Sequence, residues 1–76
     1  MYDIPVPGLY RHFKGTLYEV LFTARHSETS EELVIYRAAD GHGPVWARPL
    51  SMWGEEVERG AYRGPRFAPA GEEARL

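Results

Sequence analysis

The chain has 76 residues, of which 43% are hydrophobic and 26% are charged, and its formal net charge is −2. This length allows one domain with one small core, and a domain of this size buries only about 60% of the surface that its unfolded chain exposes. The lack of cysteine excludes disulfides, thiolate metal sites and cysteine nucleophiles, and the slightly acidic balance argues against broad, sequence-independent nucleic-acid binding.

Residues 1–9 are expected to form an extended lead-in, because Pro5 and Pro7 disfavour a helix. This segment has no long apolar run, so we predict neither a signal peptide nor a membrane span. We therefore expect a cytoplasmic protein without a membrane partner. Tyr10–Lys14 follows as a short strand or a turn.

The clearest strand is predicted over Thr16–Ala24. Its even positions form an apolar face made of Tyr18, Val20, Phe22 and Ala24. Alternation of this kind is typical of a half-buried strand. A second strand is predicted over Leu33–Ala38, because its residues are rich in β-branched and aromatic side chains.

A strong turn signal at Asp40–Gly43 separates the second strand from a third, predicted over Val45–Arg48. Leu50–Val57 has two interpretations. Its apolar residues share one helical face, with Ser51 as a cap, or the segment is a turn that leads into a strand over residues 55–57. We expect a short helical turn followed by a strand.

The C-terminal part, from Gly60 onward, is rich in Gly, Pro and Ala. Tyr62, Arg66 and Phe67 are expected to dock on the body of the domain. Residues 68–76 have little to bury and are expected to form a flexible tail. Several short strands separated by turn signals, with almost no helix, predict a mainly β fold and a small barrel.

Several short strings of residues are familiar in this order. They are Tyr10-Arg11-His12-Phe13-Lys14-Gly15, Tyr18, Val20, Ala24-Arg25-His26-Ser27-Glu28-Thr29, Val34, Tyr36, Trp46, Arg48-Pro49, Met52-Trp53 and Pro65-Arg66-Phe67. Over Gly8–Phe67 the chain resembles the small bacterial family called domain of unknown function 1653. The resemblance implies one SH3-like domain over residues 10–67, an antiparallel barrel or roll of about five strands, and it implies no activity.

The most unusual stretch lies between the first two predicted strands, in the loop Arg25–Glu31. Its candidate ligand-binding residues are Arg25, His26, Ser27, Glu28 and Thr29. Arg25 would clamp a phosphate or carboxylate, and His26 would donate or accept a proton near neutral pH. The alternative is a purely structural loop, since Thr29 and Glu32 match a capping box that would start one helical turn.

A second candidate surface consists of Tyr36, Trp46 and Arg48. The two rings lie on neighbouring predicted strands, where an aromatic groove beside the loop would bind a peptide or stack on a base. The alternative for both rings is core packing, which we favour for Trp53. Arg48, if partly buried, would need a carboxylate, and Glu28 or Glu55 would supply it from within the chain.

The histidines, His12, His26 and His42, do not have the spacing of a zinc motif, so we expect no metal and no cofactor. Ser27 beside His26 does not make a catalytic dyad by sequence alone, and we assign no catalytic residue. We predict a non-catalytic binding module in which the loop and the aromatic groove together hold a peptide, a protein or a small anionic ligand.

Two alternative functions stay open. The first is binding of a nucleotide or of single-stranded nucleic acid through stacking and phosphate contacts. Basic residues cluster early in the chain, at Arg11, His12 and Lys14, and late, at Arg59, Arg63 and Arg66. Of these, Arg11, Lys14 or Arg66 would make the phosphate contacts. The second is a small hydrolase-type enzyme that uses His26 as acid or base. The oligomeric state is open between a monomer and a weak dimer, because an exposed edge strand would pair two copies.

Overall fold

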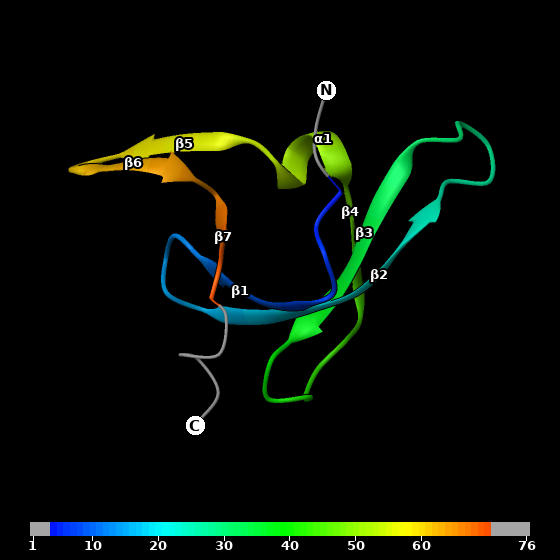
Figure 1. The fold of residues 1–76 in the computed structure, drawn as a ribbon, viewed down its shortest axis with the longest axis horizontal. Helices are drawn as coiled ribbons and strands as arrows, with labels where there is room; N and C mark the ends of the chain where they lie inside the picture. The colour runs from blue at the N-terminus through cyan, green and yellow to red at the C-terminus, as the bar shows by residue number, and fades with distance from the viewer. Residues whose placement is uncertain (1–3, 71–76) are drawn as a thin grey trace.

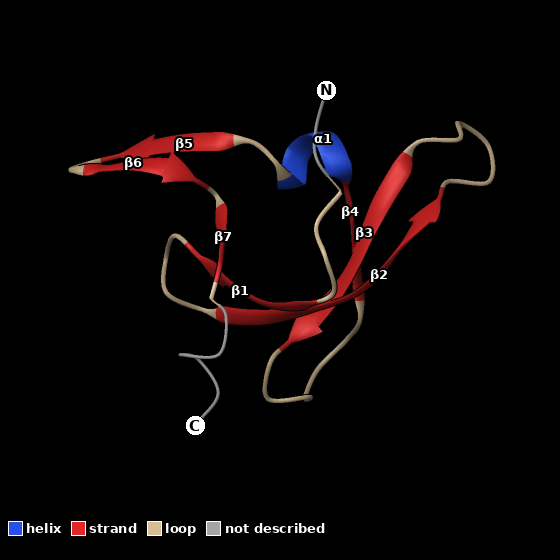
Figure 2. Ribbon diagram, viewed as in Figure 1, coloured by secondary structure: helices blue, strands red, loops and turns tan. Residues whose placement is uncertain are grey.

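The computed structural model describes residues 4–70, which form seven strands and one short helix (Figure 1). In chain order the elements are β1 (Gly8–His12), β2 (Leu17–Arg25), β3 (Glu32–Ala38), β4 (Trp46–Pro49), α1 (Leu50–Trp53), β5 (Glu56–Arg59), β6 (Tyr62–Pro65) and β7 (Phe67–Pro69). The predicted mainly β fold is confirmed, as Figure 2 shows. No helix in the described part of the chain is long and apolar enough to cross a membrane.

Five strands form one antiparallel sheet in the order β4-β3-β2-β1-β7, while β5 and β6 form a separate hairpin. The predicted five-stranded antiparallel arrangement is confirmed, but the sheet does not close into a barrel. The chain leaves the sheet after Pro49 to form α1 and the hairpin (Figure 1). Only Phe67–Pro69 returns, and this strand pairs with β1 rather than with β4, so β4 and β7 remain the outer strands.

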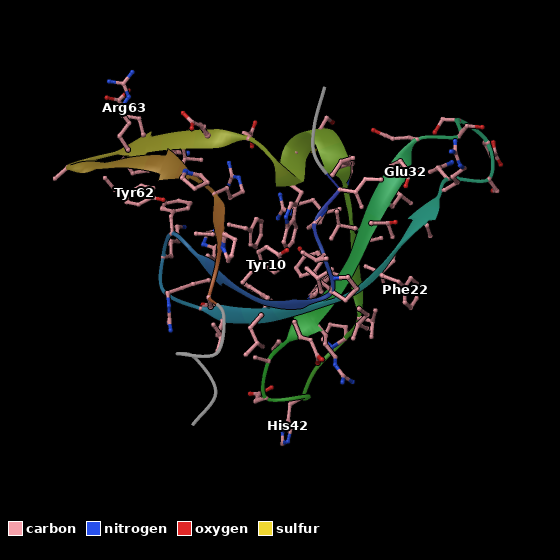
Figure 3. All side chains as sticks on the ribbon, viewed as in Figure 1. Tyr10, Phe22, Glu32, His42, Tyr62 and Arg63 are labelled. Atoms are coloured by element: carbon pink, nitrogen blue, oxygen red, sulfur yellow. The ribbon has the colours of Figure 1, made fainter. Side chains whose placement is uncertain are left out.

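A β-bulge in β2 turns part of the predicted apolar face outward. Val20 pairs with Tyr36 and Phe22 pairs with Ile35, so Leu21 is an extra residue in β2. Val20 is 1% exposed and Phe22 is 56% exposed, and Figure 3 shows Phe22 pointing away from Tyr10. The prediction that Phe22 lies on the same face as Val20 is wrong, because one inserted residue moves the following side chains to the other face of the sheet.

Aromatic rings make up most of the core. The buried cluster consists of Tyr10, Val20, Val34, Tyr36, Trp53 and Phe67, with Tyr18 and Leu50 packed against it. Aromatic side chains bury a large area with few residues, which suits a chain too short for a large aliphatic core. The preference for Trp53 as a core residue is confirmed.

The bounds of β1 and α1 differ slightly from the predicted ones. β1 begins at Gly8, inside the predicted lead-in 1–9. The helical turn and the strand predicted within Leu50–Val57 are α1 and the start of β5. The predicted cap at Ser51 is wrong: the residue at the N-cap is Pro49, and no side chain caps the helix.

The C-terminal end of the described chain is a strand. β7 pairs with β1, and the N–H of Ala70 donates to the carbonyl of Leu9 at 2.9 Å. The expected docking of Phe67 is confirmed, and the pairing continues into Ala68 and Pro69, which the sequence placed in the flexible tail. The rest of that tail, 71–76, and the start of the lead-in, 1–3, lie outside the described residues.

Candidate functional site

Backbone hydrogen bonds close the loop between β2 and β3. The N–H of His26 donates to the carbonyl of Glu31 at 2.8 Å, and the N–H of Ser30 donates to the carbonyl of His26 at 2.9 Å. The side chain of His26 adds to this ring, because its Nδ1 accepts the N–H groups of Glu28 and Thr29 at 3.1 and 3.3 Å. His26 therefore holds the loop in shape through one of its two ring nitrogens.

The predicted capping box does not start a helical turn. The Oγ1 of Thr29 accepts the N–H of Glu31 at 3.2 Å, and Ser30 has a φ angle of 64°, which lies outside the right-handed helical region. Glu32 is instead the first residue of β3. Hydroxyl side chains bond to nearby backbone groups in this way, and here the local turn replaces the helix.

The remaining loop residues face solvent. Arg25 ends β2 opposite Glu32, and its Nη2 lies 3.5 Å from Oε1 of that residue. The Arg25 side chain is 70% exposed, so this ion pair contributes little to stability. Ser27 and Glu28 are exposed at the tip of the loop.

The loop and the predicted aromatic groove lie apart. Glu32 and Tyr36 are four positions apart on β3, which corresponds to about 13 Å of extended chain. Figure 1 shows the β2–β3 loop projecting beyond the sheet, away from α1 and β7. The structure therefore does not bring Arg25–Thr29 together with Tyr36 and Trp46 into one groove.

Tyr36 and Trp46 are register partners on β3 and β4, yet they differ in burial. Tyr36 is 6% exposed, whereas Trp46 is 51% exposed. The Tyr36 ring belongs to the core, where it meets the rings of Trp53 and Phe67 edge-on. The Trp46 ring lies at the outer strand of the sheet, open to solvent.

Arg48 lies on β4 opposite Val34 and is partly buried. Its Nε donates to the hydroxyl of Tyr36 at 3.3 Å, and its guanidinium carbon lies 5.5 Å from the centre of the Phe67 ring. Within residues 4–70, no carboxylate oxygen lies within 4.0 Å of its nitrogens. In this part of the chain, the positive charge of Arg48 thus lies against an aromatic ring with no carboxylate within 4.0 Å.

The predicted internal ion pair of Arg48 is not formed. One of its two expected partners, Glu55, binds Arg66 instead, with Oε1 2.9 Å from Nη2 and 3.1 Å from Nε. The other, Glu28, is exposed in the β2–β3 loop, which projects away from α1 and β7 (Figure 1).

His12 reaches the same aromatic ring from β1. Its imidazole meets Phe67 edge-on, with ring centres 5.0 Å apart, and Tyr18 at 6.4 Å. Its Nδ1 accepts the N–H of Lys14 at 3.1 Å. We refer to Tyr36, Arg48, Phe67 and His12 together as the Arg48 site.

Burial is the largest cause of a lowered pKa for His12, and the positive charges of Arg66, Lys14 and Arg48 lower it further. From the sequence, His12 was considered as a metal ligand and as a member of the early basic cluster, but it was not among the predicted ligand-binding residues. Period-two alternation in β1 was the available signal, because it places His12 on the same face as Tyr10, which is buried.

The early and late basic clusters of the sequence meet around Phe13. The charged groups of Lys14, Arg59 and Arg66 lie 5.9, 6.0 and 5.8 Å from the centre of its ring. Tyr62 stacks on the same ring at 5.7 Å, and Figure 3 shows Tyr62 between the hairpin and the β1–β2 turn. This Phe13 patch joins two segments that are distant in sequence.

The three histidines occupy three separate places. His12 lies on β1, His26 follows β2, and His42 lies in the exposed turn after β3, at the far end of the molecule in Figure 3. In the part of the chain that the structure describes, no group of three or more His, Cys, Asp or Glu side chains is placed to hold a metal ion.

Comparisons with known proteins find one family and one similar crystal structure. The family model described as "Protein of unknown function (DUF1653)" matches residues 8–69. The chain is also similar to the crystal structure of a DUF1653 protein from Bordetella bronchiseptica, with 43% sequence identity, a TM-score of 0.78, and coverage of 88% of this chain and 88% of that chain. Comparison with curated proteins gives no significant match.

Proposed function

The chain belongs to the DUF1653 family, as its resemblance implied, and we propose that this member is a non-catalytic binding module for an anionic group. The Arg48 site would hold the anion. One observation carries the proposal: Arg48 is partly buried, is held by Tyr36 and Phe67, and has no carboxylate within 4.0 Å among the described residues.

Partial burial makes this charge costly. A guanidinium that loses part of its water destabilises the fold unless a counter-ion or hydrogen bonds compensate. In the described chain Arg48 makes one side-chain hydrogen bond, from Nε. Its two terminal nitrogens remain for a ligand, and their planar fork matches a carboxylate or a phosphate.

The surroundings of Arg48 also orient it before a ligand arrives. The Tyr36 hydroxyl restrains Nε at 3.3 Å, and the Phe67 ring lies 5.5 Å from the guanidinium carbon. A side chain restrained in its bound geometry loses less conformational entropy when the ligand binds. This favours recognition over a merely solvated surface charge.

The proposal leaves the Arg25–Thr29 loop a structural role. Nδ1 of His26 is engaged by two backbone N–H groups, and Arg25 pairs with Glu32. In residues 4–70 no hydrogen bond joins the Ser27 hydroxyl to His26, so no activated nucleophile supports the hydrolase alternative.

The test is an amide NMR titration of the labelled protein with sodium acetate and sodium sulfate, with ionic strength held constant by chloride. We expect shifts on β3 and β4 around Arg48, and at least about tenfold weaker binding in Arg48→Met, the loss expected for one charge-assisted hydrogen bond. Arg37→Met is the matched control, because Arg37 already pairs with Glu19 at 3.2 Å.

Arg48→Lys provides a second variant if Arg48→Met does not fold, since it keeps the charge and loses the fork. Shifts confined to Arg25–Thr29, or unchanged affinity in both Arg48 variants, would overturn the proposal. Shifts confined to the loop would instead support Arg25–Thr29 as the ligand-binding site.

A second candidate function is binding of single-stranded nucleic acid at the Phe13 patch. It is favoured by three cationic groups within 6.0 Å of one ring centre and by the stacked Tyr62. Fluorescence anisotropy with a labelled oligo-dT tests it. Binding that weakens steeply with salt and is lost in the Lys14→Ala, Arg59→Ala double variant would support it, and salt-insensitive or absent binding would eliminate it.

A further inference from the structure

We propose that the ligand of the Arg48 site is a phosphate monoester in its dianionic form, and that His12 is the second group that holds it. This inference rests on the proposed function, because it takes Arg48 as the first partner of the anion. It adds the chemical class of the ligand and the proton that accompanies it.

The curvature of the sheet brings both groups to one aromatic ring, that of Phe67. β4 and β1 are separated by β3 and β2, so in a flat sheet they would lie about 14 Å apart. The sheet curls around α1 instead (Figure 1). As a result the Arg48 guanidinium carbon and the His12 ring centre lie 5.5 and 5.0 Å from the centre of the same Phe67 ring.

His12 has a hydrogen-bond donor available for an anion. Its Nδ1 accepts the backbone N–H of Lys14 at 3.1 Å. A neutral imidazole that accepts at one nitrogen carries its hydrogen on the other, so Nε2 is the donor. The turn between β1 and β2 therefore sets both the tautomer and the orientation of the ring.

Among residues 4–70, the charged groups that act on His12 are all positive. Arg48 comes from β4, Lys14 from the β1–β2 turn and Arg66 from the residue before β7, while Tyr18 of β2 packs on the ring edge-on. Of these cations, Arg66 is paired with an acid, Glu55, at 2.9 Å. Burial, together with these charges, holds the pKa of His12 below its ordinary value of 6.5 and so favours the neutral imidazole.

A dianion changes this balance. Its first negative charge pairs with Arg48, and its second charge favours the imidazolium, which raises the pKa of His12 in the complex. The single charge of a monoanion such as acetate is neutralised by Arg48 alone, so it stabilises the imidazolium of His12 much less. The site therefore prefers a dianion, and the complex takes up a proton.

Proton uptake fixes the direction of the pH dependence. Because the complex holds its proton to a higher pH than the free protein does, affinity for a dianion rises as the pH falls toward and below 6.5, the ordinary pKa of histidine. Sulfate is the cleanest probe, since it stays a dianion throughout this range. A phosphate monoester itself titrates near pH 6.

The experiment measures sulfate binding at pH 5.5 and pH 7.5 by NMR and calorimetry, with chloride holding the ionic strength. For the unaltered chain we expect at least about fivefold tighter binding at pH 5.5 and a higher His12 pKa, read from its ring protons, when sulfate is present. In His12→Gln the affinity should be the same at both pH values. His42→Gln, in the exposed turn, should behave like the unaltered chain.

Three further ligands identify the molecule that carries the group: inorganic phosphate, O-phosphoserine and adenosine monophosphate. Binding of each more tightly than acetate supports the inference, and a preference among them names the source. The inference would be overturned if acetate bound as tightly as these ligands. It would also be overturned if sulfate did not raise the pKa of His12 and sulfate affinity did not change with pH.

The two proposals fail in different ways. Loss of binding in Arg48→Met, combined with pH-independent sulfate binding in the unaltered chain, would keep the anion site and reject the role of His12. Binding of neither acetate nor sulfate would reject both. The measurement of the His12 pKa uses only the unaltered chain, so it decides the question even if His12→Gln does not fold.

Discussion

Trp53 of α1 and Phe67 of β7 stack face to face, with ring centres 3.8 Å apart and planes 4° apart. This contact joins the helix that follows β4 to the last strand of the sheet. The guanidinium carbon of Arg48 lies 5.5 Å from the centre of the same Phe67 ring, and the His12 ring meets it edge-on. One aromatic side chain therefore both closes the core and supports the proposed anion site.

Replacing Trp53 with alanine should unfold most of the protein at room temperature. Truncation of a buried Trp costs about 3–5 kcal/mol, and a core of this size supplies no more than about 3–5 kcal/mol of net stability. Trp46→Ala is the matched control, because Trp46 is 51% exposed. Far-UV circular dichroism during urea unfolding measures both, and a cooperative transition in Trp53→Ala equal to that of the unaltered chain would contradict the expectation.

The bulge in β2 leads to opposite effects for two neighbouring apolar residues. Val20→Ala should lower the free energy of unfolding by about 2 kcal/mol, because it removes two buried methyl groups and leaves a cavity. Phe22→Ala should cost less than about 1 kcal/mol, the value of an exposed cross-strand pair. Urea midpoints measure both changes. A larger loss for Phe22→Ala would place that ring in the core and remove the bulge.

Ser30→Gly should stabilise the β2–β3 loop by up to about 1 kcal/mol. Ser30 has a φ angle of 64°, a left-handed conformation that costs an ordinary residue roughly 1–2 kcal/mol and glycine much less. Thermal unfolding measures the gain, and Ser27→Gly serves as the control within the same loop. A lower melting temperature for Ser30→Gly would show that this backbone conformation is not strained.

Stability in chloride buffer should decrease as the pH falls below about 6.5, in the range above the titration of carboxylates. The unfolded chain takes up a proton on His12 near its ordinary pKa of 6.5, whereas the folded chain does so only at lower pH. The unfolded state therefore binds more protons in this window, and stability rises with pH through it. Urea unfolding at several pH values measures the slope.

The His12→Gln variant should lose that slope, while His42→Gln should keep it, because His42 is exposed in a turn. Equal slopes in the two variants would assign the pH dependence to another group. Sulfate should reduce the slope in the unaltered chain, since a bound dianion raises the His12 pKa.

Local patterns accounted for much of the fold. The alternation in β2 and the β-branched residues of β3 predicted both strands within a residue or two of their observed bounds. The bulge at Leu21 was not predicted, because the apolar residues at even positions continue through it and the alternation in the sequence looks unbroken. The predicted capping box did not form, because the Thr29 hydroxyl accepts the backbone N–H of Glu31, which is closer in sequence than Glu32.

The site was predicted less well than the fold. Five of its candidate residues were chosen as neighbours in sequence, Arg25–Thr29, and the structure ties His26 and Thr29 into the loop itself. Tyr36 and Arg48 do meet, through the hydrogen bond at 3.3 Å. His12 and Phe67 of the proposed site were not predicted as binding residues. Strand alternation in β1 places His12 on the same, inward face as Tyr10.

The sequence by itself determined the mainly β class, the five-stranded antiparallel sheet, the place of Trp53 in the core and the family. The class and the place of Trp53 follow from local patterns and residue types. The family and the five-stranded sheet follow from the short strings of residues that carry the resemblance, and neither step needs knowledge of distant contacts. Only the tertiary structure decided that Arg48 and His12 both lie against the ring of Phe67. These three residues lie on β4, β1 and β7, and the order and curvature of the sheet, which depend on pairing between distant segments, bring them together.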